Sequence, residues 1–164
     1  MWLAGQCAFP PLIPEKPIVV ARQGLVLEQR FQAPVDKRYL LELQFAFPST
    51  EARIADTLVG SWGRDPYCDS SIEESAIPPA ARKALGEVVS LRVVVRTRPG
   101  GPVVTDKTFH SRCNNSMMSN VKGREVGWLT LTRGEYFVQV YNQSAQPAFT
   151  GVRTSLALVA GSGK

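Results

Sequence analysis

Alternation of apolar and polar residues recurs along this chain of 164 residues and limits the folds that it can adopt. In the segment 39–47, every second residue is large and apolar: Tyr39, Leu41, Leu43, Phe45 and Phe47. A period of two residues is typical of a strand with one buried face and one solvated face. The chain is therefore expected to fold mainly as β-sheet.

Seven segments are predicted to be strands, and turn residues separate several of them. They are residues 25–31, 39–47, 88–97, 103–109, 125–131, 135–141 and 149–159. Helical signals occur between the second and third strands, where two short helices are expected at residues 51–59 and 79–85. This arrangement predicts a two-sheet β-sandwich with a short helical insertion.

Prolines are frequent in the first twenty residues, where Pro10, Pro11, Pro14 and Pro17 remove backbone donors. Residues 1–20 are therefore expected to be an extended lead-in outside the core. Residues 21–160 are predicted to form a single domain, because 44% hydrophobic residues are enough for one continuous core. Two polar stretches, residues 60–79 and 110–124, are expected to be long loops.

Basic residues exceed acidic ones and give a formal net charge of +5. They are spread along the chain, and the densest neighbours, Arg82 and Lys83, do not form the basic patch of a nucleic-acid-binding protein. No nucleic-acid partner is therefore expected. The chain has no run of about 18 apolar residues, so no transmembrane segment is expected either.

The three cysteines leave two interpretations open. Cys68 and Cys113 lie in polar segments and are a candidate disulfide, which would place the protein in an oxidising compartment. The alternative is three free thiols in a cytosolic protein, because spacing does not show that two cysteines meet. Residues 1–7 lack an export signal, although Leu-Ala-Gly before Cys7 resembles the end of a bacterial lipoprotein signal, with Gln6 intervening.

Residues 131–140, Leu-Thr-Arg-Gly-Glu-Tyr-Phe-Val-Gln-Val, resemble a motif that begins a late strand in many immunoglobulin-like sandwiches. In those proteins the tyrosine, here Tyr136, bonds the backbone of the preceding corner. From about residue 15 to 160, the chain also resembles small exported bacterial domains of unknown function. Some of these are periplasmic or lipoprotein-like, and others are immunity proteins beside secreted toxins. The resemblance implies an immunoglobulin-like sandwich of about seven strands in the periplasm or cell envelope.

No catalytic or metal-binding constellation is evident in the sequence. His110 is the only histidine, and it is expected to be exposed in a polar loop, so a hydrolase that uses it is a weak alternative. Acidic residues with Cys68 cluster in one loop without the spacing of a metal site: Asp65, Asp69, Glu73 and Glu74. No enzymatic activity, metal or cofactor is therefore expected.

Aromatic and arginine side chains mark two candidate contact regions, because these residue types dominate binding energies. The first is the loop that contains Trp62, Arg64 and Tyr67, although Trp62 could instead cover the end of the sandwich. The second is the strand 135–141, from which Phe137 and Tyr141 are expected to point outward. Arg92, Arg96 and Arg98 are expected on an outer face as well, unless the helical insertion packs over it.

These features predict a non-enzymatic binding protein of the periplasm or cell envelope that recognises another protein. An immunity-type inhibitor of a secreted toxin is the most concrete form of this hypothesis. The alternative is a carbohydrate or cell-wall binding module that uses Trp62 and Tyr67 as stacking surfaces.

Overall fold

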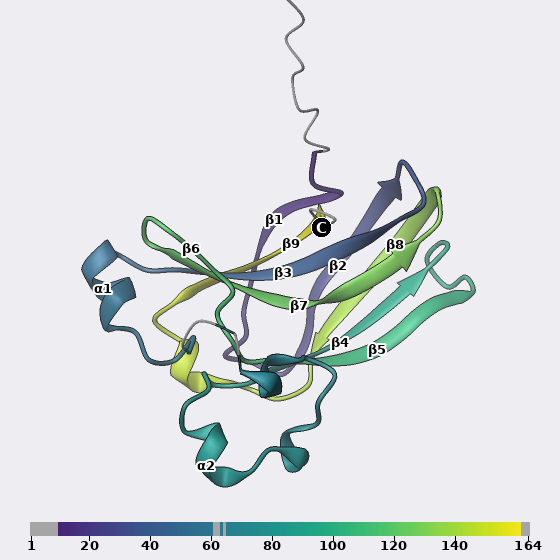
Figure 1. The fold of residues 1–164 in the computed structure, drawn as a ribbon. Coiled ribbons are helices and arrows are strands. Elements are labelled where there is room, and N and C mark those ends of the chain that lie inside the picture. The colour runs from purple at the N-terminus through teal and green to yellow at the C-terminus, as the bar shows by residue number, and fades with distance from the viewer. Residues whose placement is uncertain (1–9, 61–62, 64, 162–164) are drawn as a thin grey trace, which may run out of the picture.

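The computed structural model describes residues 10–60, 63 and 65–161. In this part of the chain, nine strands form two antiparallel sheets that pack as a sandwich (Figure 1). The five-stranded sheet has the order β1 (Ile13–Ile18), β9 (Arg153–Ala160), β3 (Lys37–Ala46), β7 (Val121–Leu131), β6 (Ser116–Met118). The four-stranded sheet has the order β2 (Gly24–Ala33), β8 (Gly134–Asn142), β4 (Val89–Arg96), β5 (Val103–Ser111). The predicted two-sheet sandwich with a short helical insertion is confirmed.

All seven predicted strands are present, and alternation explains their placement. Leu41, Leu43 and Phe45 of β3 point inward and are at most 1% exposed. From the other sheet, Leu91, Val93 and Val95 of β4 are fully buried. The core therefore lies between the sheets, where alternate side chains of strands such as β3, β4 and β8 point.

Strand β1 corrects the expectation that the proline-rich segment lies outside the core. Ile13 and Ile18 at its two ends are 1% and 6% exposed, and Val20 after it is also buried. Pro14 and Pro17 are tolerated because β1 is an edge strand, which pairs only with β9. An extended, proline-containing segment can thus still contribute to a sandwich core.

The polar stretch 110–124 is also more regular than the sequence predicts. Strand β5 continues to Ser111, and β6 and β7 form a hairpin that turns at Ser119 and Asn120. Ser119 has a φ of 53°, a left-handed conformation that tight turns require. The expected long loop is therefore limited to a few residues between β5 and β6.

Both helices of the insertion are shorter than predicted. Helix α1 (Thr50–Ala55) begins where the Ser49 side chain accepts a bond from the Ala52 amide. It ends at Asp56, whose carboxylate accepts the amides of Leu58 and Val59 and so replaces further helical bonds. Helix α2 (Pro79–Arg82) forms a single turn, and three short 3₁₀ segments are present: η1 (Pro66–Cys68), η2 (Glu74–Ala76) and η3 (Pro147–Phe149).

Three buried cations hold the insertion against the sandwich. Arg112 donates to the main-chain oxygens of Tyr67, Asp69 and Ile72, and Lys122 donates to both the main chain and the carboxylate of Asp56. Arg124 donates to the main-chain oxygens of Leu58, Val59, Glu87 and Ser111. Among the described residues between β3 and β4, the fully buried apolar side chains are Val59 and Ile77. Hydrogen bonds from the buried cations therefore provide much of the stabilisation that a hydrophobic core provides elsewhere.

Two tyrosine corners close the same end of the sandwich. The Tyr136 hydroxyl donates to the main-chain oxygen of Thr132 at 2.8 Å, which is the contact that the motif at residues 131–140 implies. The Tyr39 hydroxyl donates to the main-chain oxygen of Val35, also at 2.8 Å. The two corners are linked, because the Arg133 amide donates to the Asp36 carboxylate.

Removing either corner hydroxyl should weaken the fold modestly. Tyr136→Phe and Tyr39→Phe are each expected to lower the free energy of unfolding by about 1 kcal/mol, because each loses the hydrogen bond to the main chain and keeps its ring. Tyr136→Phe also loses the contact of its hydroxyl with the Thr132 hydroxyl, at 3.0 Å. Urea unfolding would measure both losses. Tyr141→Phe is the control, since its hydroxyl makes no hydrogen bond within the described residues; an equal loss there would contradict the assignment.

Candidate binding surface

Strand β8 presents two half-buried aromatic side chains on the outer face of the four-stranded sheet. Tyr136, Val138 and Val140 point into the core, so Phe137 and Tyr141 point outward, as the alternation predicts. This orientation places both rings in the middle of the sheet, because β8 pairs with β2 on one side and β4 on the other.

Arginines flank both rings. Phe137 lies opposite Arg30 of β2 and Arg96 of β4, and Tyr141 lies opposite Arg92 of β4. Side chains directly opposite each other in antiparallel strands are neighbours on one face. These five residues are named here the aromatic–arginine face.

Hydrogen bonds to neighbouring residues hold two of these arginines in position. Arg92 donates two hydrogen bonds to the Asp106 carboxylate in a bidentate arrangement, with nitrogen–oxygen distances of 2.8 and 2.6 Å. This hydrogen bond raises the pKa of Arg92 and lowers the pKa of Asp106. Arg96 donates to the main-chain oxygen of Gly101. Such an exposed pair adds little stability, but side chains that are already positioned lose less entropy when a partner binds.

The helical insertion leaves this face uncovered. Helices α1 and α2 lie at one end of the sandwich, away from most of the β2–β8–β4–β5 surface (Figure 1). The insertion reaches the sheet at the far end of β5, where the His110 amide donates to the main-chain oxygen of Ser70 at 2.7 Å. The alternative that helices cover the aromatic–arginine face is therefore wrong.

Tyr67 and Arg98, two further predicted contact residues, are not part of this face. Tyr67 is half-buried in η1 of the insertion, and its amide donates to the Asp65 carboxylate. Trp62 and Arg64 fall outside the described residues. Arg98 lies in the turn after β4, not on the strand face where it was predicted. Arg30 was not singled out in the sequence, because the pairing of β2 with β8 joins segments far apart in the chain.

A disulfide joins Cys68 of the insertion to Cys113 after β5, with 5.4 Å between their Cα atoms. Beside it, the Gly63 amide donates to the main-chain oxygen of Asn114 at 2.7 Å. The insertion is thus attached covalently to the sandwich near η1. Cys7 lies outside the described residues.

His110 is not the exposed loop histidine that the sequence suggests. It belongs to β5 and is 8% exposed, with its Nδ1 atom 2.8 Å from the Ser90 hydroxyl of β4. A Glu73 carboxylate oxygen lies 3.1 Å from Nε2, although not in hydrogen-bond geometry. A hydroxyl, an imidazole and a carboxylate are the three groups that hydrolases use as nucleophile, base and orienting acid, and here they belong to Ser90, His110 and Glu73. However, Ser90 lies within a regular strand, and neither it nor His110 lines any of the three cavities described.

Further features of the described chain concern metal binding, a buried carboxylate and helix length. No group of three or more histidine, cysteine, aspartate or glutamate side chains is placed there to hold a metal ion. Glu42 of β3 lies opposite Glu125 of β7, and burial raises the pKa of Glu42 while the Gln44 side chain lowers it and Glu125 raises it further. Within residues 10–60, 63 and 65–161, no helix is long and apolar enough to cross a membrane.

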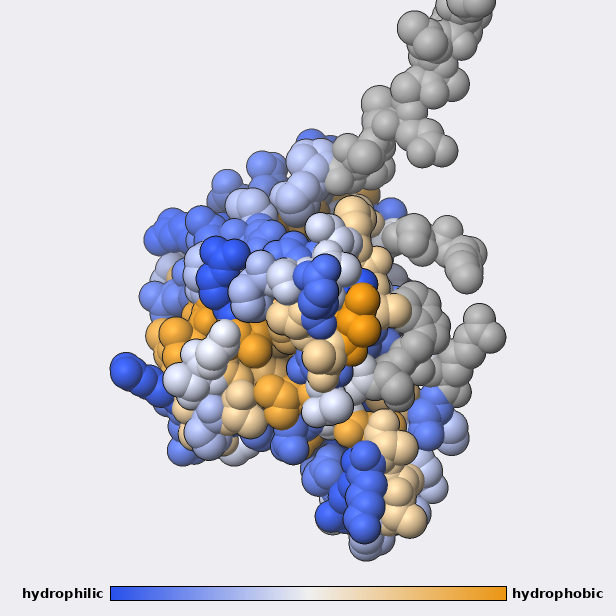
Figure 2. Space-filling view, turned by 90° about the vertical axis from the view of Figure 1, so that its left-hand side faces the viewer, coloured by the Kyte–Doolittle hydropathy of each residue, from blue (hydrophilic) through white to orange (hydrophobic). Residues whose placement is uncertain are grey.

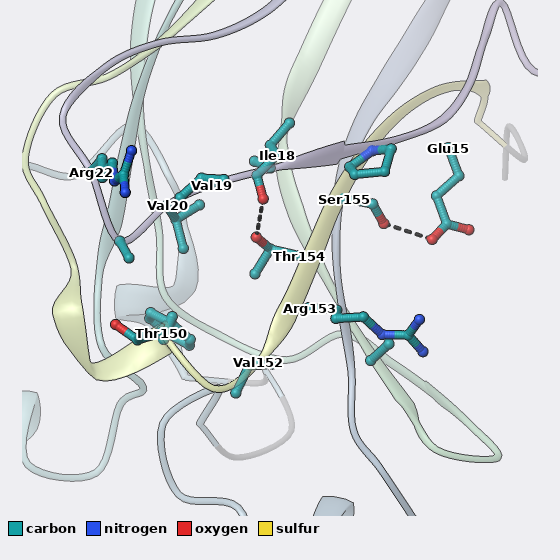
Figure 3. Close-up of a pocket in the computed structure, with 14 residues that line it drawn as sticks. Glu15, Ile18, Val19, Val20, Arg22, Thr150, Val152, Arg153, Thr154 and Ser155 are labelled. Carbon is teal, nitrogen blue, oxygen red and sulfur yellow. Dashed lines mark hydrogen bonds between the residues drawn. The ribbon is translucent and has the colours of Figure 1, made fainter.

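A cavity of about 730 Å³ opens between β1 with its following turn and the start of β9 (Figure 3). Val19 and Val20 lie on one side of it, and Thr150 and Val152 lie opposite. Arg22 and Arg153 are also part of its lining. Two bonds join β1 to β9 beside it: the Thr154 hydroxyl donates to the main-chain oxygen of Ile18, and the Ser155 hydroxyl donates to the Glu15 carboxylate.

Comparisons with known proteins place the chain in a family without giving an activity. The crystal structure of a protein from Sulfurospirillum deleyianum is similar, with a TM-score of 0.68 and 18% sequence identity. The match covers 94% of this chain and 100% of that one, and at this identity it shows the fold alone. No curated protein matches. The model of a family described as a domain of unknown function, DUF5625, matches residues 15–160, so the chain belongs to that family.

Proposed function

We propose that this protein is a non-enzymatic binding protein of the bacterial periplasm or cell envelope that recognises another protein through its aromatic–arginine face. The observation that carries the proposal is Phe137 between Arg30 and Arg96 on an uncovered sheet. Aromatic rings and arginines are enriched among residues that contribute most to binding. A sheet holds them in fixed positions, which reduces the entropy lost on association.

The charge of this face indicates the kind of partner. Three arginines surround the two rings, and of these three Arg92 is paired with a carboxylate, that of Asp106, whereas Arg30 and Arg96 form no ion pair with a described residue. A partner with an acidic patch around an apolar contact would complement this arrangement. An inhibitor of the immunity type that covers an acidic surface of a secreted toxin is the most concrete form of the proposal.

The disulfide supports the proposed compartment. Disulfides persist in the periplasm and outside the cell, whereas cytosolic thiols are kept reduced. The Cys68–Cys113 bond fixes the insertion to the sandwich, so oxidation contributes to the folded structure itself.

A carbohydrate or cell-wall binding module is the second candidate. Phe137 and Tyr141 are both half-buried on the outer face of the sheet, and exposed parts of aromatic rings are surfaces on which sugars stack. A glycan array would separate the candidates: binding to defined glycans that Tyr141→Ala abolishes would favour the module, and an array without binding would remove it.

Substitution of Phe137 tests the protein-binding proposal. A pull-down from the native envelope fraction would identify the partner, and calorimetry would then give its affinity for purified variants. Phe137→Ala is expected to weaken binding by about 2 kcal/mol, or roughly 30-fold, because it removes the central ring of the face. Arg98→Ala, in the neighbouring turn, is the control and should bind like the wild type. An envelope fraction that yields no partner, or equal affinities for Phe137→Ala and the wild type, would contradict the proposal.

A further inference from the structure

Exposed hydrophobic side chains gather at the end of the sandwich that carries α1. Ile54 of α1 is 69% exposed, Met117 and Met118 of β6 are 48% and 80% exposed, and Val19 after β1 is 56% exposed. Figure 2 shows this end, with hydrophobic side chains across its middle and hydrophilic ones around them. Exposed apolar groups that gather in this way mark an interaction surface.

The strand register places Met118 in a row of side chains that crosses the five-stranded sheet at this end. Ala46 of β3 lies opposite Arg153 of β9 on one side and Val121 of β7 on the other, and Val121 lies opposite Met118. This row runs along the outer face of the five-stranded sheet, because Phe45 beside Ala46 is buried. It leads from the cavity beside Val19, which Ala46 and Arg153 line, to Met118 next to the turn of the β6–β7 hairpin. Met117, opposite the buried Lys122, points to the other side of this hairpin, where it and Ile54 line a second cavity of about 540 Å³.

Four cations line these two cavities. Arg22 and Arg153 line the cavity beside Val19, whereas Arg53 and Lys83 line the cavity beside Ile54. Arg53 donates to the main-chain oxygen of Ser119 and to the Met117 sulfur, both neutral groups. None of the four forms an ion pair with a carboxylate among the described residues.

Acidic groups at this end are fewer and largely engaged. Asp56 is paired with Lys122 at 2.7 Å, and Glu15 accepts the Ser155 hydroxyl. Glu51, in the first turn of α1, is exposed. The surface therefore combines protruding apolar side chains with a net positive charge.

We propose that this surface, here named the lipid face, docks on an anionic membrane. Its apolar side chains would enter the boundary between headgroups and acyl chains, while its cations bind lipid phosphates. The apolar groups protrude around two cavities and include flexible methionines, which suits a fluid surface better than a rigid partner. The proposal is independent of the aromatic–arginine face, which lies on the other sheet and stays accessible when the lipid face is docked (Figure 1).

Vesicle binding tests the apolar part of the lipid face. The wild type is expected to sediment with vesicles of phosphatidylethanolamine containing one third phosphatidylglycerol. The double variant Ile54→Asp/Met118→Asp should bind them about tenfold more weakly, because two apolar groups are lost and two negative charges are gained. Val103→Asp/Val104→Asp is the matched control: these residues are 48% and 44% exposed at the edge of β5, and the charge change is identical. It should bind like the wild type.

A second pair of variants tests the cations. Arg22→Glu/Arg153→Glu is expected to reduce binding to the anionic vesicles by about tenfold or more, because each basic residue near such a surface contributes to binding. Arg98→Glu/Arg133→Glu makes the same charge change in turns at the opposite end and should reduce binding much less (Figure 1). Added salt should weaken wild-type binding.

Several results would overturn the proposal. They are absence of wild-type binding to the anionic vesicles, equal binding to phosphatidylcholine vesicles, and equal effects of the test and control variants. Light scattering adds one more: loss of a dimer in Ile54→Asp/Met118→Asp without wild-type vesicle binding would assign the surface to contact between two copies. Circular dichroism would verify that each variant is folded, as expected for substitutions of exposed side chains.

Discussion

Arg124→Met is expected to lower the free energy of unfolding by about 3–5 kcal/mol, one of the two largest effects predicted for this protein. The Arg124 side chain is completely buried and donates to four main-chain oxygens, which belong to Leu58, Val59, Glu87 and Ser111. Methionine could still pack against Phe45, whose ring centre lies 5.1 Å from the guanidinium carbon. It would leave the buried oxygens without a donor, and the insertion would lose its main attachment to β7.

The charge of Arg124 is part of this interaction. Burial lowers the pKa of its guanidinium to about 9, so the group is still protonated at neutral pH. A charge without a carboxylate partner is costly to bury unless hydrogen bonds compensate for the lost water. The four oxygens provide that compensation, and they come together when the insertion folds over β7. Arg124 and the insertion therefore depend on each other.

Guanidinium chloride unfolding would measure the loss, and hydrogen exchange would locate it. In Arg124→Met, the amides around Val59 and Glu87 are expected to exchange faster than those in the centre of β4. Arg98→Met, at an exposed turn, is the control and should change the stability by less than about 0.5 kcal/mol. A loss below about 1 kcal/mol for Arg124→Met would mean that these oxygens find other donors and that Arg124 does not hold the insertion.

The same residue shows why the sandwich could be predicted from sequence while its insertion could not. Alternation predicts strands because every second residue faces the core, and this placed Leu41 and Val93 correctly. On β7, Lys122 and Arg124 point inward, whereas the sequence predicts that residues 110–124 form a polar loop. Most of their acceptors lie more than 35 residues away and belong to the folded insertion, whereas the Ser111 oxygen, 13 residues from Arg124, belongs to β5. Local pattern carries no information about such contacts.

The candidate binding surface could likewise be predicted only in part from the sequence. The outward direction of Phe137 and Tyr141 follows from alternation along one strand. Their arginine neighbours depend on the pairing of β8 with β2 and β4, which are separated from it in sequence and could not be paired in advance. His110 was misplaced for a related reason: its neighbour Ser90 lies across a strand pair, and Ser70 of the insertion covers the edge beside it.

Loss of the Cys68–Cys113 bond is the second large effect, with an expected destabilisation of about 4 kcal/mol. The bond joins residues 45 positions apart, and a loop of that length gains considerable freedom in the unfolded chain when it is opened. The melting temperature of Cys68→Ser/Cys113→Ser should therefore fall by roughly 8–16 °C, given the usual shift per kcal/mol for a domain of this size. Unfolding should begin locally at η1, because Arg112 then remains as its chief attachment.

Calorimetry of four samples would test this prediction: the wild type and Cys68→Ser/Cys113→Ser, each with and without reductant. Reductant should lower the melting temperature of the wild type to that of the double variant and leave the variant unchanged. Cys7→Ser is the control for the remaining thiol and should melt like the wild type in both conditions. A wild type that does not respond to reductant would show that the bond does not stabilise the fold. Such a result would also remove the main physical reason for placing the protein in an oxidising compartment, because a bond without effect on folding gives no advantage there.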